Sequence, residues 1–414
     1  MESALSIEHA KHALMVFGLI LMLGTVSGLL SRATKIPDVV IFLLAGMAVG
    51  PTGFDWVDIP ANSELNQLIL IFGSSYILFD GGASLRFKVM REVWITVAVI
   101  STVGILITGA ITGWAAREIL GVPLIVALLL GATLASTDPA TLVPIFKQVR
   151  IKDRVAQTIM SESAFNDAMG AIVTFAVLAV AMGQADFSVG SSLLHLGWQT
   201  GVGIAAGAVL GFIGAAVIAH EKYGFLADYS RLVTLMAVIA AYIGADGLQA
   251  SGFMAVFVFG MMLGNMESLG FVVGEREQEE MEDFISTTGL IMRMFIFVML
   301  GSQVDFALMG KYAIGGALVV TVLMLVARPV TVFACTIVDR RARWSFREML
   351  FMCWTRETGV IPAALAGMLV GMKAPGAEMI ASVTFIAILM TILIQATTTK
   401  WLAGRLGLLH ADPA

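Results

Sequence analysis

The sequence predicts an all-α polytopic membrane protein, and three observations lead to that fold class. Hydrophobic residues make up 58% of the 414 residues and charged residues only 13%, whereas soluble domains carry about 25% charged residues. Apolar segments long enough to cross a bilayer recur along the chain. Basic residues concentrate in every second loop between these segments. A string of soluble domains is excluded, because so few charged residues cannot cover several separate cores.

Thirteen segments approach the roughly 20 apolar residues that a spanning helix needs. They lie near residues 12–31, 37–52, 64–83, 92–117, 122–147, 153–183, 191–219, 229–246, 249–267, 283–304, 312–338, 348–371 and 376–401. The sequence therefore predicts thirteen transmembrane helices.

The distribution of Lys and Arg gives a direction to these spans. The sequence has 25 Lys and Arg residues, and most of them lie in alternate loops and in the C-terminal tail. The exceptions are Lys11, Arg117, Lys311 and Lys373 in the other loops, and Arg293, Arg328 and Arg356 within spans. The positive-inside rule then places the N-terminus outside and the C-terminus in the cytoplasm. This alternation requires an odd number of spans. We expect the acidic segment 275–283 to belong to a cytoplasmic loop near 268–282.

Two predicted spans contain interruptions. In the fifth span, Pro139 follows Thr137 and Asp138, and a proline removes a backbone donor and disfavours helical geometry at the residue before it. The twelfth span has a similar interruption at 358–362. These spans become equivalent if the first six and last six helices are inverted repeats around a seventh linker helix. Paired interruptions in two repeats indicate the binding site of a transporter.

The sixth span carries two acids within Ser-Glu-Ser-Ala-Phe-Asn-Asp, residues 161–167. A charged side chain at membrane depth costs at least ~2.5–3.5 kcal/mol, which favours a functional interpretation. Glu162 and Asn166 share one helical face, as do Ser163 and Asp167. Asp167 has no basic residue near it in sequence, and burial disfavours the charged form of a carboxylate. We therefore expect it to bind either a proton or a small cation, and competition for one site suffices for exchange.

Oxygen atoms around Asp167 complete a predicted cation site. Hard cations prefer oxygen ligands, and Asp138, Ser163 and the Thr137 carbonyl are available. Asp138 could instead cap the broken helix. Glu162 has a different predicted role, as a structural partner of Arg328, because buried ion pairs hold geometry more than they add stability.

Other charged residues within spans have open interpretations. Asp80, at the end of the third span, is a cytoplasmic gate, a secondary ion ligand or a plain interfacial acid. Arg293 snorkels toward the inner surface or pairs with an acid. Arg356 and Glu357 are adjacent and point to different faces, and either could act as a gate or a secondary group.

The motif Ser-Glu-Ser-x-x-Asn-Asp after Thr-Asp-Pro resembles the monovalent cation:proton antiporter superfamily, and most of all the NhaP-like sodium/proton antiporters, relatives of the animal sodium/proton exchangers. The resemblance also covers the Phe-Asp-Gly-Gly segment 79–82 and the arginine-bearing spans. It implies an NhaA-like inverted repeat with crossed broken helices 5 and 12. The implied parts are a dimerisation domain (1–91 and 220–311), a core ion-transport domain (92–183 and 312–405) and a linker helix (184–219).

The resemblance also implies residue roles. Asp167 would be the shared carrier of cation and proton, and the other implied residues are Asp138, Thr137 and Ser163 in the ion site and Asn166, Glu162 and Arg328 between core helices. Similar proteins with Asn before the key Asp tend to be electroneutral, and electrogenic ones often keep a lysine where this chain has Arg328. Both features favour one cation per proton. Similar exchangers often have Glu where this chain has Asp80, which leaves the role of Asp80 open.

The predicted function is exchange of Na⁺ for H⁺ by alternating access, in the plasma membrane. K⁺/H⁺ exchange is the nearest alternative, and a sodium-coupled organic-anion symporter that uses Arg356 as its anchor is a more distant one. Motifs such as His-Glu-x-x-His and Gly-x-Ser-x-Gly are absent from the sequence, so we do not expect an enzyme. No cofactor or nucleic acid is expected besides the transported ions, and the partners are the lipid bilayer and, by resemblance, a second copy of the chain.

Overall fold

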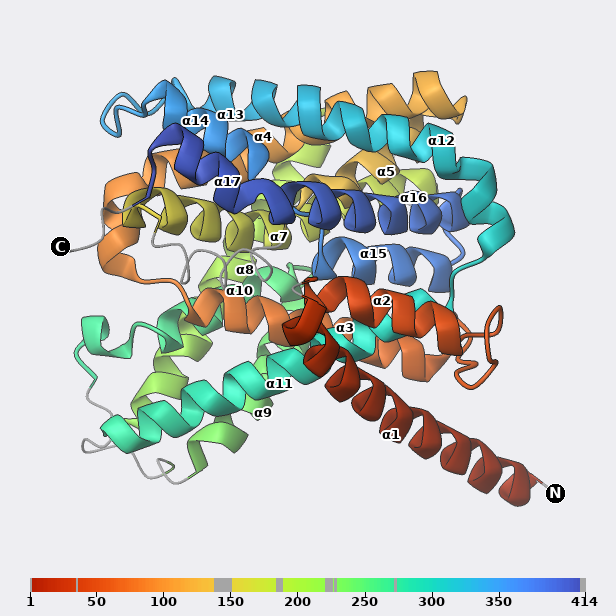
Figure 1. Ribbon diagram of the computed structural model, residues 1–414. Coiled ribbons are helices and arrows are strands. Elements are labelled where there is room, and N and C mark those ends of the chain that lie inside the picture. Colours follow the sequence, from red (N-terminus) through yellow and green to blue (C-terminus); the bar gives the residue numbers. More distant parts are fainter. Residues whose placement is uncertain are drawn as a thin grey trace.

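The computed structural model describes residues 2–34, 36–137, 151–183, 189–219, 226, 229–271 and 274–409. Within these ranges the regular elements are helices, apart from one bridge between Ile151 and Leu409. Eight of the described helices are long and apolar enough to cross a membrane, and four shorter ones are also apolar. Figure 1 shows the two ends of the chain on opposite sides of the molecule. The protein is all-helical in its described part and carries several candidate membrane spans, as predicted.

Each of the first seven predicted spans overlaps one helix of the described residues. These helices are α1 (Glu2–Thr34), α2 (Asp38–Val49), α3 (Glu64–Ala83), α4 (Phe87–Leu120), α5 (Leu124–Ala135), α7 (Asp153–Ala181) and α8 (Val189–Ile218). The helix α1 begins ten residues before the predicted span. The helix α5 ends early, because Ser136 is extended (φ −77°, ψ 158°). The rest of the predicted fifth span, with Asp138, Pro139 and Pro144, lies outside the described residues.

The later spans are more irregular than predicted. Their helices are α9 (Ser230–Gly247), α10 (Gly252–Leu263), the short 3₁₀-helix η2 (Met266–Leu269), α11 (Glu275–Ser302), α12 (Phe306–Val322), α13 (Arg328–Thr336), α14 (Phe346–Trp354), α15 (Val360–Gly371), α16 (Ala377–Met390) and α17 (Thr397–Leu406). Two π-helical turns, η3 (Leu323–Ala327) and η4 (Thr391–Ala396), interrupt the predicted eleventh and thirteenth spans. Such turns are rare in proteins overall, but those that occur are often at functional sites.

The prediction that residues 275–282 form a loop was wrong, because they are the first turns of α11. Acidic side chains near a helix N-terminus interact favourably with the helix dipole. Arg276 also contacts Glu280 one turn later at 3.0 Å, and Arg231 of α9 reaches the same carboxylate. Hydropathy does not reveal this part of the helix, since its residues are mostly charged and precede the apolar stretch.

The interruption of the twelfth span occurs slightly earlier than predicted. The helix α14 ends at Trp354 and α15 begins at Val360, so the break is 355–359 and not 358–362. Pro362 lies in the first turn of α15, where a proline is tolerated because the backbone N–H groups there lack intrahelical acceptors. All five residues of the break are buried.

The three largest clusters of buried apolar side chains hold the described helices together. The largest joins α2, α3, α10 and α11 with the facing sides of α7 and α15. A second joins α5, α12 and α16, and a third joins α4, α7, α13 and α14. The helix α7 contributes to all of them, through Ala168, Leu178 and Val155 respectively. It therefore lies between the main groups of helices (Figure 1).

Close approach of α4 and α5 depends on glycine. A Cβ atom on Gly131 would collide with the carbonyl oxygen of Gly109. We expect Gly131→Ala to destabilise the protein by about 1–3 kcal/mol, the range for overpacking a buried contact. The measurement is the thermal stability of the detergent-solubilised protein. Gly244→Ala is the matched control, because a Cβ atom there meets nothing within 4 Å. Equal stabilities of the two variants would contradict the prediction.

Candidate functional site

The predicted ion site begins where α5 stops being helical. Ser136 is extended, and both Ser136 and Thr137 are buried. Gly170 of α7 makes room for this segment, because a Cβ atom on it would lie 2.8 Å from the Ser136 Cβ. The end of α5 is thus held directly against the helix that carries the acidic motif.

A network of short hydrogen bonds joins Thr137 to α7. The Thr137 amide donates to Asn166 Oδ1 at 3.0 Å, and Asn166 Nδ2 donates to Thr137 Oγ1 at 2.8 Å. The hydroxyl of Ser163 lies 3.0 Å from Thr137 Oγ1 and donates to the Thr137 carbonyl at 2.5 Å. The side chain of Asn166 therefore replaces the helical partner that the Thr137 amide lacks. The structure brings Thr137 together with two residues that lie 26 and 29 positions later in the sequence.

Asp167 follows this network directly on α7 and is only 5% exposed. It lies one helical turn after Ser163, on the same face. The predicted fourth residue, Asp138, lies outside the described residues. Carboxylate, hydroxyl and carbonyl oxygens are suitable ligands for a hard cation. In the described ranges, no three His, Cys, Asp or Glu side chains gather as they would around a resident metal ion.

Glu162 and Arg328 form a buried, two-pronged ion pair. Arg328 Nη2 donates to Glu162 Oε2 at 2.8 Å, and Nη1 contacts Oε1. Arg328 Nε donates to the Met352 carbonyl of α14 at 3.1 Å, and Ser101 of α4 donates to the Glu162 carbonyl at 3.2 Å. Both side chains are 3% exposed or less. This pair ties α7 to α4, α13 and α14.

Arg356 lies in the break between α14 and α15 and is 1% exposed. Its guanidinium donates to the carbonyls of Leu134 and Ser136 at the end of α5. Those carbonyls lie in the last turn of a helix, where intrahelical donors are lacking and partial negative charge accumulates. Glu357, the next residue, is equally buried. The break between α14 and α15 is therefore bonded to the end of α5 through Arg356.

Asp80 lies apart from this network, on α3. Its carboxylate lies against Gly289 of α11, and it is attracted electrostatically by Arg293 of that helix. The neighbouring Gly81 faces Ala164 of α7, with 3.7 Å between the Ala164 Cβ and a Cβ built on the glycine. Asp80 therefore lies on α3, next to the residue through which α3 contacts the acidic motif of α7.

The face of α7 toward α3 and α10 differs from its polar face. At Ala164 the contact is with Gly81, and the ring of Phe165 meets Phe257 of α10 edge-on, with 4.7 Å between centroids. Both contacts are apolar. The helix thus presents hydrogen-bonding groups to one side and close-packed apolar groups to the other.

A second polar cluster was not predicted. The amide and hydroxyl of Thr96 on α4 donate to Asp339 Oδ2 at 3.2 and 2.7 Å, and Trp344 Nε1 donates to the Thr96 hydroxyl at 2.9 Å. Arg154 of α7 lies over the Trp344 ring at 4.0 Å. These contacts hold the connection between α13 and α14 against α4 and α7. Local sequence spacing does not reveal these contacts, because the partners are more than 180 residues apart.

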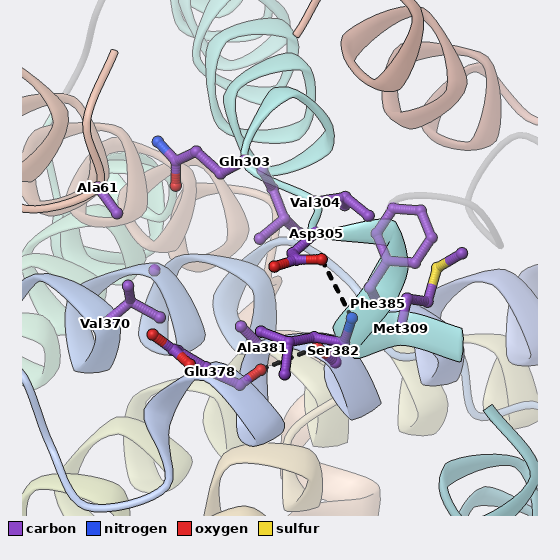
Figure 2. A pocket seen from close by; sticks show the side chains of 13 residues that line it. Ala61, Gln303, Val304, Asp305, Met309, Val370, Glu378, Ala381, Ser382 and Phe385 are labelled. Carbon is purple, nitrogen blue, oxygen red and sulfur yellow. Dashed lines mark hydrogen bonds between the residues drawn. The ribbon is translucent and has the colours of Figure 1, made fainter. Parts of the chain in front are cut away.

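A cavity of about 200 Å³ lies where α11 ends and α12 begins, bordered by α15 and α16. Its polar lining residues are Gln303, Asp305, Glu378 and Ser382 (Figure 2). Asp305 Oδ1 also caps α12 by accepting from the Leu308 amide at 3.1 Å. Neither Asp167 nor Ser163 lines this cavity, so it is separate from the predicted ion site.

Known proteins are similar to this chain over nearly its whole length. The family model described as "Sodium/hydrogen exchanger, transmembrane" matches residues 18–405. Na(+)/H(+) antiporter 1 of Methanocaldococcus jannaschii is 33% identical over 360 residues, which cover 84% of this chain and 81% of that protein. The K(+)/H(+) antiporter NhaP of Alkalimonas amylolytica is 27% identical over 404 residues, which cover 95% and 67% of the two chains.

The arrangement of helices also matches a solved structure. The sodium proton antiporter MjNhaP1 from Methanocaldococcus jannaschii superposes with a TM-score of 0.84 and 30% sequence identity. The match covers 98% of this chain and 99% of that one. Sequence and fold therefore point to the same family.

Proposed function

The chain belongs to the transmembrane sodium/hydrogen exchanger family, and we propose that it exchanges Na⁺ for H⁺, one for one, with Asp167 carrying each in turn. Family membership makes it a multi-pass membrane antiporter of a monovalent cation against protons. The observation that carries the finer proposal is the position of Asp167, a 5% exposed carboxylate directly after the network that joins α5 to α7.

The competition at Asp167 has a simple physical basis. A carboxylate out of water is stabilised either by accepting a proton or by contact with a cation, and one such group does not hold both. Thr137 and Ser163 supply neutral oxygens beside it, and we propose Asp138 as a further ligand. Alternating access of this site to the two aqueous compartments then couples cation movement to opposite proton movement.

The charge balance around Asp167 supports electroneutral exchange. Asn166 is neutral, and both ends of its amide are engaged with Thr137. Arg328 is engaged with Glu162 and Met352. Neither residue then adds a second titrating group to the cycle. On this basis we propose one cation per proton.

The same comparisons keep K⁺ as the alternative ion, because a relative of similar identity is named a K(+)/H(+) antiporter. Selectivity among monovalent cations depends on cavity size and ligand geometry. The organic-anion symporter has less support. Its proposed anchor, Arg356, donates to the Leu134 and Ser136 carbonyls.

We further propose thirteen membrane crossings, two crossed broken helices and the domain division into 1–91 with 220–311 and 92–183 with 312–405. The opposite positions of the termini support an odd number of crossings (Figure 1). The contact of Arg356 with the end of α5 supports a crossing of the two breaks. The core would rock or slide, elevator-like, against the other domain. The cytoplasmic C-terminus, the plasma-membrane location and the homodimer remain predictions.

Transport assays in proteoliposomes test the proposal. An inward cation gradient should drive protons out, with the lowest apparent KM for Na⁺ when Na⁺, K⁺ and Li⁺ are compared. With the membrane potential clamped at zero, we expect no steady current, because each cycle exchanges one positive charge for another. A steady sodium-dependent current would contradict the one-for-one exchange inferred from Asn166. A lower KM for K⁺ would favour the alternative ion.

A further inference from the structure

The two broken spans use the same kind of bond to the span that follows them. At the first break, the Thr137 amide donates to Asn166 Oδ1 of α7 at 3.0 Å. At the second break, the Thr358 amide donates to Thr391 Oγ1, at the end of α16, also at 3.0 Å. Both breaks are therefore anchored by a backbone amide that donates to a side chain of the next span.

The second break runs antiparallel to the last span. Trp354 Nε1, on the near side of the break, donates to Thr398 Oγ1 at 2.8 Å. Thr358, on the far side, contacts Thr391. Gln395 lies in the π-helical turn η4, between Thr391 and Thr398 in sequence. Because both of these threonines bond to the break, we infer that the Gln395 side chain faces it as well.

Several polar atoms at this place have no hydrogen-bond partner among the described residues. Gln395 is fully buried, and neither its Oε1 nor its Nε2 is bonded. The hydroxyl of Thr358 and Nη1 of Arg356 are in the same state. The backbone carbonyl of Gln395, in contrast, accepts from Thr399 at 2.8 Å. The missing hydrogen bonds are therefore those of side chains, and buried side-chain polar atoms are rarely left without a partner.

We propose that Gln395, Thr358 and Arg356 surround a buried water-binding site at the break between α14 and α15. An amide needs both an acceptor for its N–H groups and a donor for its oxygen. Water supplies both, and buried waters typically make about three such bonds. A metal cation satisfies only the oxygen atoms and is repelled by the Arg356 guanidinium. Water is the ligand that fits this set of groups.

This water site has a consequence for transport, which rests on the proposed function. Arg356 binds the carbonyls of Leu134 and Ser136, and the next residue, Thr137, belongs to the ion site. Water held by Gln395 would fix the guanidinium on its other side. Gln395 then acts on the ion site through Arg356, as a positioning residue.

The water site is tested by a structure of the full-length protein in lipid nanodiscs, at a resolution that shows ordered water. We expect density within hydrogen-bond distance of the Gln395 amide and of Arg356 Nη1 or the Thr358 hydroxyl. A Gln395 amide bonded directly to protein groups, without water, would overturn the proposal. This test is independent of transport, so it stands even if the chain does not exchange Na⁺.

The positioning role is tested with Gln395→Leu, which keeps the volume and removes both hydrogen-bonding groups. We expect the apparent KM for the cation to rise by about 10–100-fold, as for the loss of outer contacts in other ion sites. Gln395→Asn keeps a donor and an acceptor and should recover part of the affinity. Thr234→Val, an equally buried change in α9, should leave KM unchanged. If Gln395→Leu lowers only the maximal rate or the amount of folded protein, and Gln395→Asn recovers nothing, the role is merely structural and the positioning proposal fails.

Discussion

Replacing Asp167 with alanine should abolish cation-driven proton movement in proteoliposomes. The variant loses the one carboxylate that, under the proposed mechanism, exchanges a proton for a cation inside the protein. Asp167→Asn should have the same effect, although it preserves the volume and a polar side chain, because an amide neither titrates nor carries a negative charge. The measurement is vesicle dequenching with each alkali cation in turn, at several pH values.

The comparison with an unrelated acid makes this test specific. Asp246, which is exposed near the end of α9, gives the matched variant Asp246→Asn, and we expect it to transport at the rate of the unaltered protein. Both Asp167 variants should be folded, as judged by thermal stability and monodispersity in detergent. Measurable exchange by either folded variant would show that Asp167 is not the shared carrier.

Removing one member of the Glu162–Arg328 pair should destabilise the protein strongly. Breaking a buried ion pair costs about 3–5 kcal/mol, because the remaining charge is left in a medium of low polarity without compensation. We therefore expect Arg328→Ala to lower the thermal stability of the purified protein clearly and to reduce its yield from membranes. Glu162→Ala should behave in the same way.

A double variant tests whether the instability of the single variants comes from the unpaired charge that each leaves behind. Glu162→Leu combined with Arg328→Met removes both charges and fills part of the space, so it should be more stable than either single alanine variant. Arg231→Ala breaks an exposed pair with Glu280 and should change stability little, since exposed pairs contribute weakly. A double variant less stable than the two single ones would contradict the role assigned to the buried charge.

Much of the fold could be predicted because spans are encoded locally. Apolar length places each of the thirteen predicted segments on a helix or a pair of helices, and the third span, 64–83, coincides with α3. Local signals failed where helices are stabilised by something other than apolar length. The first turns of α11 are charged and not apolar, and the π-helical turn at Thr391–Ala396 has no proline or glycine near it in sequence.

The predicted site likewise has parts that local sequence signals reveal and parts that they do not. The spacing of Ser163, Asn166 and Asp167 on one helix is a local property, and so is the end of α5 at Ala135. The acceptors of Arg356 are not local, because they lie 220 or more residues earlier in the chain. Gln395 could have been noticed as a polar residue in an apolar span, but the position proposed for it beside the second break depends on how α14 and α17 pack.

The unequal faces of α7 have a mechanical consequence. On the side of Glu162 the helix is fastened to its neighbours by directional bonds, which break abruptly when displaced. On the side of Ala164 and Phe165 it rests on hydrocarbon, where each atom pair contributes only about 0.1–0.2 kcal/mol and a new neighbour replaces the old one as the surfaces shift. Resistance to shear should therefore be low along that contact. Under the proposed elevator-like movement, the helix that holds Asp167 would travel with α13 and α14 while α3 and α10 stay behind.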